Sequence, residues 1–304
     1  MSGNGRALVL GGGGAAGNAW EIGVIAGLIE AGLDVIEADL IIGTSSGSTV
    51  AAQITGATKP AELLAGILTA APSPPTASVG PNGGRVAIGP AANHMEITGA
   101  IIAAAKDAAD MRRRMGAAAL ETDAASHSAA QSQWRATVAA RLSSQTWPQQ
   151  RILIPAVDAD TGEPVVFDRH SGIDLVDAVA ASTSNGFGVP PYRIGDRRYI
   201  NGGYRRNENA DLAAGCARVL VLSPFSGRSR HPLDWGMHLA AQVEELRAGD
   251  SRVETIFPDG DANDIFAIGS NQMDPSTRPP AARAGYHQGK ALAEQLTEFW
   301  RLTV

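Results

Sequence analysis

Ser45 is the residue of this sequence whose surroundings most clearly suggest chemistry. It stands at the centre of Gly43-Thr44-Ser45-Ser46-Gly47, a Gly-x-Ser-x-Gly pentapeptide. In such a pentapeptide the serine occupies a strained turn between a strand and a helix, and the two glycines remove side chains that would clash there. The following helix also places its positive N-terminal end beside the hydroxyl. The pattern is therefore typical of a nucleophilic serine.

Backbone donors for such a serine could come from a glycine run earlier in the chain. Gly11 to Gly14 follow the apolar run from Arg6 to Leu10. The N–H groups of Gly12, Gly13 and Gly14 would form an oxyanion hole, because amide donors stabilise the charge that develops during acyl transfer. Acyl transfer requires both donors and a nucleophile, and the two loops are expected to follow adjacent parallel strands. This arrangement favours the oxyanion interpretation.

The glycine run has two other interpretations. Gly12, Gly14 and Gly17 satisfy the G-x-G-x-x-G pattern of a dinucleotide-binding turn. Three acidic residues stand near the position of the acid that binds a ribose in such a unit, namely Asp34, Glu37 and Asp39. This alternative predicts an NAD-binding oxidoreductase. In the remaining interpretation, the glycines serve only close packing.

A serine nucleophile also needs a base to activate it. In α/β-hydrolases the acid and the histidine follow the serine along the chain. The histidines of this sequence are His94, His127, His170, His231, His238 and His287. None has the strand-end or glycine-rich surroundings of a catalytic loop, so the pattern points to no particular histidine.

The elements that would position these residues alternate between strands and helices. Strands are expected at residues 6–10, 40–42, 151–157, 165–167, 192–194, 198–200, 218–222 and 253–257. Helices are expected at residues 20–32, 48–55, 61–69, 174–181, 235–246 and 281–302, and in two or three pieces between 95 and 140. Residues 71–92 are rich in Pro and Gly, which predicts a surface loop or lid. The alternation favours one α/β domain over two.

Composition excludes several classes of protein. A formal net charge of -6 over 304 residues argues against a nucleic-acid partner. One cysteine, Cys216, permits neither an intramolecular disulfide framework nor a multi-cysteine metal site. No apolar stretch reaches the about 18 residues of a membrane span, and no signal-peptide pattern is present. A cytoplasmic protein is expected, and the oligomeric state stays open.

A third short motif, Asn201-Gly202-Gly203, follows a strand-like segment. Together with Gly12 to Gly17 and the pentapeptide at 43–47, it makes the chain resemble the patatin-like phospholipase family. Members of that family combine a GGGxxG oxyanion loop, a GxSxG elbow and a DGG or DGA turn whose aspartate completes a Ser–Asp dyad. The three motifs stand here in the family's order, and Asn209 to Ala213 also looks similar. The resemblance covers about residues 6–222.

The resemblance implies a three-layer α/β/α sandwich with a mainly parallel central sheet, formed by a single domain over residues 1–304. It implies Ser45 as nucleophile, residue 201 as its dyad partner and the glycine run as oxyanion hole. The expected reaction is cleavage of an acyl ester of a lipid, without a cofactor or metal. Transient contact with a membrane surface is expected as well.

Two residues depart from the family's pattern. Ala16 stands where Lys or Arg is usual, which removes a positive charge but leaves the backbone donors. Asn201 stands where the family has aspartate, and an amide has no appreciable basicity near pH 7. Because general base catalysis is typically worth about 10²–10⁴-fold, hydrolysis by this chain should be slow.

Asn201 has four explanations. The exchange could be engineered to trap a substrate, or the chain could be a natural, inactive pseudoenzyme that binds acyl groups. Alternatively, the base could be Asp158, Asp196 or a histidine. Finally, the Asn201-Gly202 sequence could deamidate, which would restore an aspartate.

Overall fold

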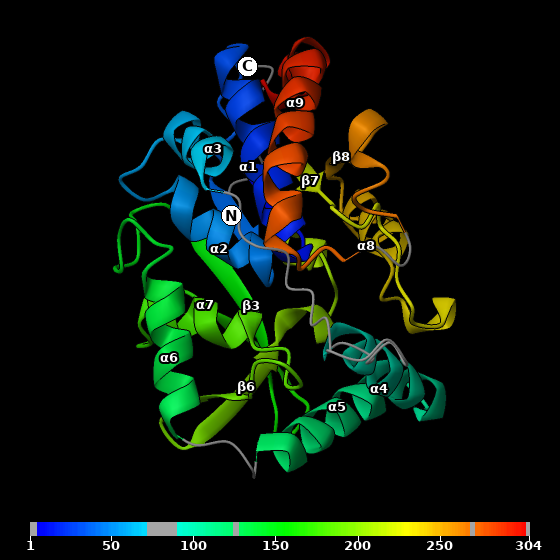
Figure 1. Ribbon diagram of the computed structural model, residues 1–304. Coiled ribbons are helices and arrows are strands. Elements are labelled where there is room, and N and C mark those ends of the chain that lie inside the picture. The colour runs from blue at the N-terminus through cyan, green and yellow to red at the C-terminus, as the bar shows by residue number, and fades with distance from the viewer. Residues whose placement is uncertain (1–4, 72–89, 124–127, 268–270, 302–304) are drawn as a thin grey trace.

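The computed structural model describes residues 5–71, 90–123, 128–267 and 271–301 (Figure 1). Its strands are β1 (Arg6–Leu10), β2 (Leu40–Gly43), β3 (Ile152–Asp158), β4 (Pro164–Phe167), β5 (Tyr192–Ile194), β6 (Arg197–Asn201), β7 (Arg218–Leu222) and β8 (Arg252–Ile256). Within the described residues they form an eight-stranded sheet in the order β5-β6-β3-β2-β1-β7-β8, with β4 paired to β3. One sheet therefore connects elements from both ends of the chain.

The sheet is mainly parallel, as the sequence predicted. Strands β3, β2, β1, β7 and β8 run parallel to one another. Strands β4, β5 and β6 add an antiparallel extension beside β3. In the parallel part Leu10 pairs with Gly43 on one side and with Leu222 on the other. The loops that follow these three residues consequently leave the same edge of the sheet.

Helices cover both faces of the sheet. They are α1 (Gly14–Glu30), α2 (Ser46–Ile54), α3 (Pro60–Thr69), α4 (Pro90–Ala104), α5 (Ala108–Asp123), α6 (Ser128–Ala139), α7 (Leu175–Thr183), α8 (Leu239–Ala248) and α9 (Arg278–Trp300). Residues of α1, α2, α7 and α9 pack on Leu8 and Ile41 from one side. Residues of α8 and of the short 3-10 turn Ala210–Ala213 pack on Val9 and Ile42 from the other. The result is the predicted three-layer α/β/α arrangement.

Helices α1 and α9 lie side by side with their backbones in contact (Figure 1). A Cβ added to Gly27 would lie 2.2 Å from the carbonyl oxygen of Tyr286, and one added to Gly289 would lie 2.2 Å from that of Val24. Trp20 strengthens the contact by donating its Nε1–H to Oε1 of Gln288 at 3.0 Å. Glycines that lower the helix propensity of α1 therefore allow it to pack closely against α9.

The alanine-rich segment after residue 95 forms the helices α4, α5 and α6, which agrees with the prediction of two or three pieces. Met111 and Met115 of α5 pack on Ile200 and Met237. Of the loop predicted at residues 71–92, residues 72–89 lie outside the described residues, and Pro90 onward belongs to α4. Helices α4 and α5 thus stand close to the strand that ends at Asn201.

One helix starts later than predicted. Residues 235–246 were expected to be helical, but α8 begins at Leu239. Leu233–Trp235 forms a separate 3-10 turn that ends at Gly236, whose φ of 62° lies in the left-handed region. A left-handed residue cannot continue a right-handed helix, so α8 can start only after Gly236.

In the described part of the chain, no helix is both long enough and apolar enough to cross a membrane. The assignment of residues 1–304 to a single domain stays a prediction.

Candidate active site

Ser45 stands in a strained turn at the edge of the sheet. It follows β2 and precedes α2, and its backbone has φ 54° and ψ −121°, a conformation that a residue with a Cβ rarely adopts. A Cβ at Gly43 would lie 2.5 Å from the oxygen of Gly47, and one at Gly47 would lie 2.2 Å from the oxygen of Leu10. Both glycines of the pentapeptide are therefore required by close backbone contacts. The backbone N–H of Ser45 donates to Oγ of Ser182 at 3.0 Å, which helps to hold the turn.

Asn201 lies at the end of β6 and contacts Ser45 directly. Its Nδ2 donates to Oγ of Ser45 at 2.9 Å, although 156 residues separate the two. Its Oδ1 accepts from the backbone N–H of Gly203 at 2.7 Å, so the orientation of the amide is fixed from the other side. The backbone N–H of Asn201 donates to the oxygen of Ser184 at 2.7 Å. The two residues that the sequence paired are thus in hydrogen-bonding contact.

The glycine run lies beside this pair, and among its proposed oxyanion donors the amides of Gly12 and Gly13 already have partners. The N–H of Gly12 donates to the oxygen of Asn207 at 3.1 Å. The N–H of Gly13 donates to Oγ of Ser46 at 2.8 Å. Gly14 is the first residue of α1, so its N–H has no helical carbonyl to bind. An oxyanion that used Gly12 or Gly13 would have to replace an existing partner.

Pro224 and Met273 pack against the same loop. A Cβ at Gly13 would lie 2.5 Å from Cβ of Pro224, and a Cβ at Gly14 would lie 2.8 Å from Sδ of Met273. A Cβ at Gly12 would lie 3.5 Å from Cβ of Ser45, which shows how near the loop is to the serine. Only residues without side chains fit between these neighbours.

The other candidate bases lie elsewhere. Asp158 binds Arg197 at 3.1 Å and accepts from the turn that follows it. His231 is bound to Ser229, and burial together with the positive charges of Arg230 and His238 lowers the pKa of His231 to about 4.

Asp196 lies in the turn that joins β5 and β6, at the opposite end of β6 from Asn201. His127 is outside the described residues. In the part of the chain that the structure describes, no histidine or carboxylate forms a hydrogen bond with Oγ of Ser45.

The acidic residues of the dinucleotide alternative lie at the wrong edge of the sheet. Asp34, Glu37 and Asp39 all precede β2, and Asp39 accepts from the backbone N–H of Arg6 at the start of β1. Because β1 and β2 are parallel, these residues lie at the edge opposite the glycine run. None of the three can bind a ribose whose phosphates rest on Gly12 to Gly14.

Two buried carboxyl groups near the glycine run were not predicted. Glu208 accepts from Nδ2 of Asn207 at 3.0 Å and from Oγ of Ser223 at 2.7 Å, yet burial raises its pKa. Glu21 of α1 is fully buried, and neither of its carboxylate oxygens has a hydrogen-bond partner within the described residues. Burial raises the pKa of Glu21 well above its ordinary value, and the charge of Glu208 adds to the shift. The one sequence feature that could have indicated Glu21 is its place as an acid among the apolar residues from Trp20 to Ile29. The sequence around Asn207 and Glu208 has no comparable feature.

The described residues include no group of three or more His, Cys, Asp or Glu side chains that could hold a metal ion.

Comparison with known proteins gives one family. The family model described as patatin-like phospholipase matches residues 8–214. No curated protein sequence matches the chain. Among solved structures, the crystal structure of VipD from Legionella pneumophila is similar at 13% sequence identity and a TM-score of 0.42, over 96% of this chain and 67% of that one. That structural likeness is too weak to bear on fold or function.

Proposed function

The chain belongs to the patatin-like phospholipase family, which supports a lipid ester hydrolase activity in general, and on this premise we propose a serine acyl hydrolase site in which residue 201 limits the rate. Ser45 is the nucleophile, and residue 201 is its dyad partner. The substrate is an acyl ester of a lipid. The proposal rests above all on the 2.9 Å hydrogen bond between Nδ2 of Asn201 and Oγ of Ser45.

The reaction follows from this contact. With an aspartate at position 201, Oγ of Ser45 would attack the ester carbonyl carbon while its proton passes to that carboxylate, and a tetrahedral intermediate would form. The intermediate would collapse to an acyl-enzyme when the proton returns to the leaving alcohol. Water would then attack the acyl-enzyme and give its proton to the same aspartate. An aspartate at 201 would place a carboxylate oxygen within reach of the serine proton in both steps.

Asn201 reverses the direction of this hydrogen bond. The amide donates to Oγ of Ser45 and cannot accept its proton, so the hydroxyl is oriented but not activated. Loss of general base catalysis typically costs about 10²–10⁴-fold in rate. We therefore expect the chain to bind lipid esters and to turn them over slowly.

The oxyanion is assigned to the glycine run. Gly14 and Gly13 are the better donors, because the N–H of Gly12 is committed to the backbone of Asn207. Use of Gly13 requires its N–H to leave Oγ of Ser46. Amides held in this way at the start of a helix suit a developing negative charge.

The donation from Asn201 to Ser45 also favours a second candidate, an acyl-binding pseudoenzyme. Such a protein would keep the lipid-ester site without the reaction. Transient contact with a membrane surface, where such lipids reside, is common to both candidates. A cytoplasmic location is also part of the proposal, and a single cysteine, Cys216, is compatible with a reducing compartment.

Labelling with a fluorophosphonate tests the nucleophile. The Asn201 chain and its variants Asn201→Asp and Ser45→Ala are incubated with the reagent, and intact mass followed by peptide mapping locates any adduct. We expect rapid addition at Ser45 in Asn201→Asp, slow addition in the chain with Asn201 and none in Ser45→Ala. An adduct in neither Ser45-containing protein would overturn the assignment.

A further inference from the structure

The tripeptide Asn207-Glu208-Asn209, here called the clamp, touches each of the three motifs. Its first contact is with the glycine run. The oxygen of Asn207 accepts from the N–H of Gly12 at 3.1 Å, and Nδ2 of Asn207 donates to the oxygen of Gly12 at 3.2 Å. Both backbone polar groups of Gly12 are therefore held by one residue. These two bonds fix the position of the glycine run relative to Ser45.

Asn209 connects the other two motifs. Its Nδ2 donates to Oγ1 of Thr44 at 2.9 Å, and the backbone oxygens of Gly202 at 3.2 Å and Arg206 at 2.5 Å also accept from it. Thr44 immediately precedes Ser45, and Gly202 immediately follows Asn201. Oγ1 of Thr44 also donates to the backbone oxygen of Glu208 at 3.3 Å. One buried amide thus connects the chain beside the nucleophile to the chain beside its partner.

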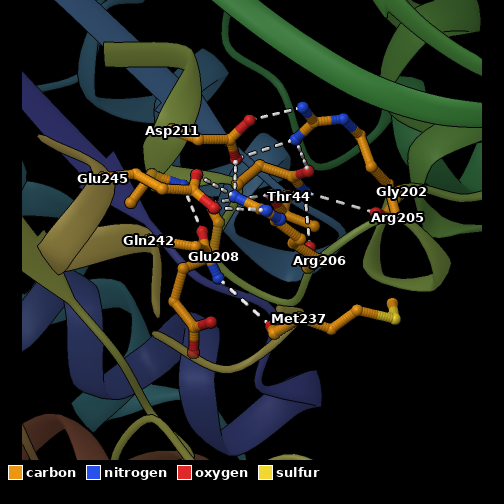
Figure 2. A network of polar contacts seen from close by, with 11 residues as sticks. Thr44, Gly202, Arg205, Arg206, Glu208, Asp211, Met237, Gln242 and Glu245 are labelled. Carbon is orange, nitrogen blue, oxygen red and sulfur yellow. Dashed lines mark hydrogen bonds and ion pairs between the residues drawn. The ribbon is translucent and has the colours of Figure 1, made fainter. Parts of the chain in front are cut away.

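Neighbouring polar residues hold the clamp in turn, and Figure 2 shows Arg205, Asp211 and Gln242 in the network of polar contacts around Glu208. Nη1 of Arg205 donates to Oδ1 of Asn209 at 2.7 Å, and the same guanidinium forms an ion pair with Asp211. The backbone N–H of Ala210 donates to Oε1 of the fully buried Gln242 at 2.7 Å. Because every polar group of the Asn209 amide has a partner, its orientation is determined.

The backbone of Asn209 adds to this arrangement. Its φ of 55° and ψ of 35° lie in the left-handed region, which asparagine adopts more readily than most residues with a side chain. The residue is fully buried. A glycine here would keep the backbone without strain and remove only the amide, which makes the position suitable for a specific test.

We propose that Asn209 is a positioning residue that sets the separation between Ser45 and residue 201, while Asn207 sets the oxyanion loop against them. This inference rests on the proposed function, since it concerns the same reaction. Its physical basis is that misplacement of a reacting group by about 1 Å can cost 10²-fold in rate. Asn207 and Asn209 both lie outside the three motifs, and each connects them from behind: Asn207 contacts Gly12, and Asn209 contacts Thr44 and Gly202.

The test uses Asn201→Asp as parent, so that turnover is measurable. Asn209→Gly is compared with the parent in hydrolysis of p-nitrophenyl butyrate, in the rate of Ser45 labelling by fluorophosphonate and in thermal unfolding. Asp250→Gly is the matched control, because Asp250 has a left-handed backbone with φ 64° and lies at an exposed turn after α8. We expect kcat of Asn209→Gly to fall about 10- to 100-fold with KM within about twofold. We expect kcat and KM of Asp250→Gly to match the parent.

A milder variant keeps the inference testable if Asn209→Gly does not fold. Thr44→Val removes the hydroxyl that Asn209 binds and keeps the shape of the side chain. We expect its kcat and its labelling rate to fall together, by less than in Asn209→Gly, at a temperature where the protein is fully folded. If both variants keep the parent kcat while only the unfolding temperature falls, the role of Asn209 is structural and the inference is wrong. A parent that neither hydrolyses the ester nor forms an adduct would instead overturn the proposed function itself.

Discussion

Gly13 and Ser46 are joined by a hydrogen bond of 2.8 Å from the backbone N–H of the first to Oγ of the second. The bond ties the start of α1 to the start of α2, which are separated by 33 residues of sequence. It also occupies an amide that the proposed mechanism offers to the oxyanion. The serine after the nucleophile therefore competes with the transition state for one donor.

Ser46→Ala, made in Asn201→Asp, should raise kcat for ester hydrolysis by about fivefold. A hydrogen bond of about 1 kcal/mol then no longer has to be broken as the oxyanion forms. The unfolding temperature should fall, because the N–H of Gly13 loses its buried partner in the resting protein. Steady-state kinetics and thermal unfolding measure the two effects. A fall in kcat would show that the hydroxyl positions the loop and does not block it.

Asn201→Asp should raise the rate of ester hydrolysis by about 10²–10⁴-fold, because a carboxylate can accept the proton of Ser45. The measurement is kcat/KM for p-nitrophenyl esters of several chain lengths. The double variant that also carries Ser45→Ala serves as control and should lose the gain. If Asn201→Asp remains as slow as the chain with Asn201, the pseudoenzyme interpretation is favoured.

Gly27→Ala should lower the free energy of unfolding by at least about 2 kcal/mol, because the added methyl group would overlap the backbone of α9. Gly66→Ala is the matched control. Gly66 is an exposed residue within α3, and no atom lies within 4 Å of an added Cβ. Alanine should therefore stabilise the helix there by about 0.5–1 kcal/mol. Urea unfolding measures the free energy of unfolding of both variants. If that free energy changed in the same direction in both, the packing argument would be wrong.

Glu21→Gln should stabilise the protein more at pH 8 than at pH 5. Burial raises the pKa of Glu21 in the folded state, so the folded protein holds this proton more tightly than the unfolded chain does. The associated stability is present below the unfolded pKa of about 4.3 and is lost as the pH rises through the raised folded pKa. A glutamine cannot ionise and avoids that loss. A pH-independent difference in the free energy of unfolding would contradict the prediction. The charge of the neighbouring Glu208 contributes to the raised pKa of Glu21.

Local sequence was sufficient for most of the fold. Short apolar runs that end at turn residues predict β1, β2 and β7, because a buried parallel strand needs a short continuous apolar segment followed by a turn. The start of α8 was placed wrongly because the left-handed Gly236 interrupts an otherwise helical pattern. The three motif loops could also be located from local sequence, because the local backbone geometry of such loops requires glycines and a serine at fixed spacing.

Sequence by itself thus determined which residues could react: Ser45 in its strained turn, an amide at position 201 in place of a base, and a glycine run after the first strand. Only the tertiary structure decided how these groups meet. The order of strands in the sheet brings Asn201 to 2.9 Å from Ser45, places Ser46 on the amide of Gly13, and sets Asn209 between two of the loops. Such contacts join segments far apart in the chain, so they depend on packing and register, which no local pattern encodes.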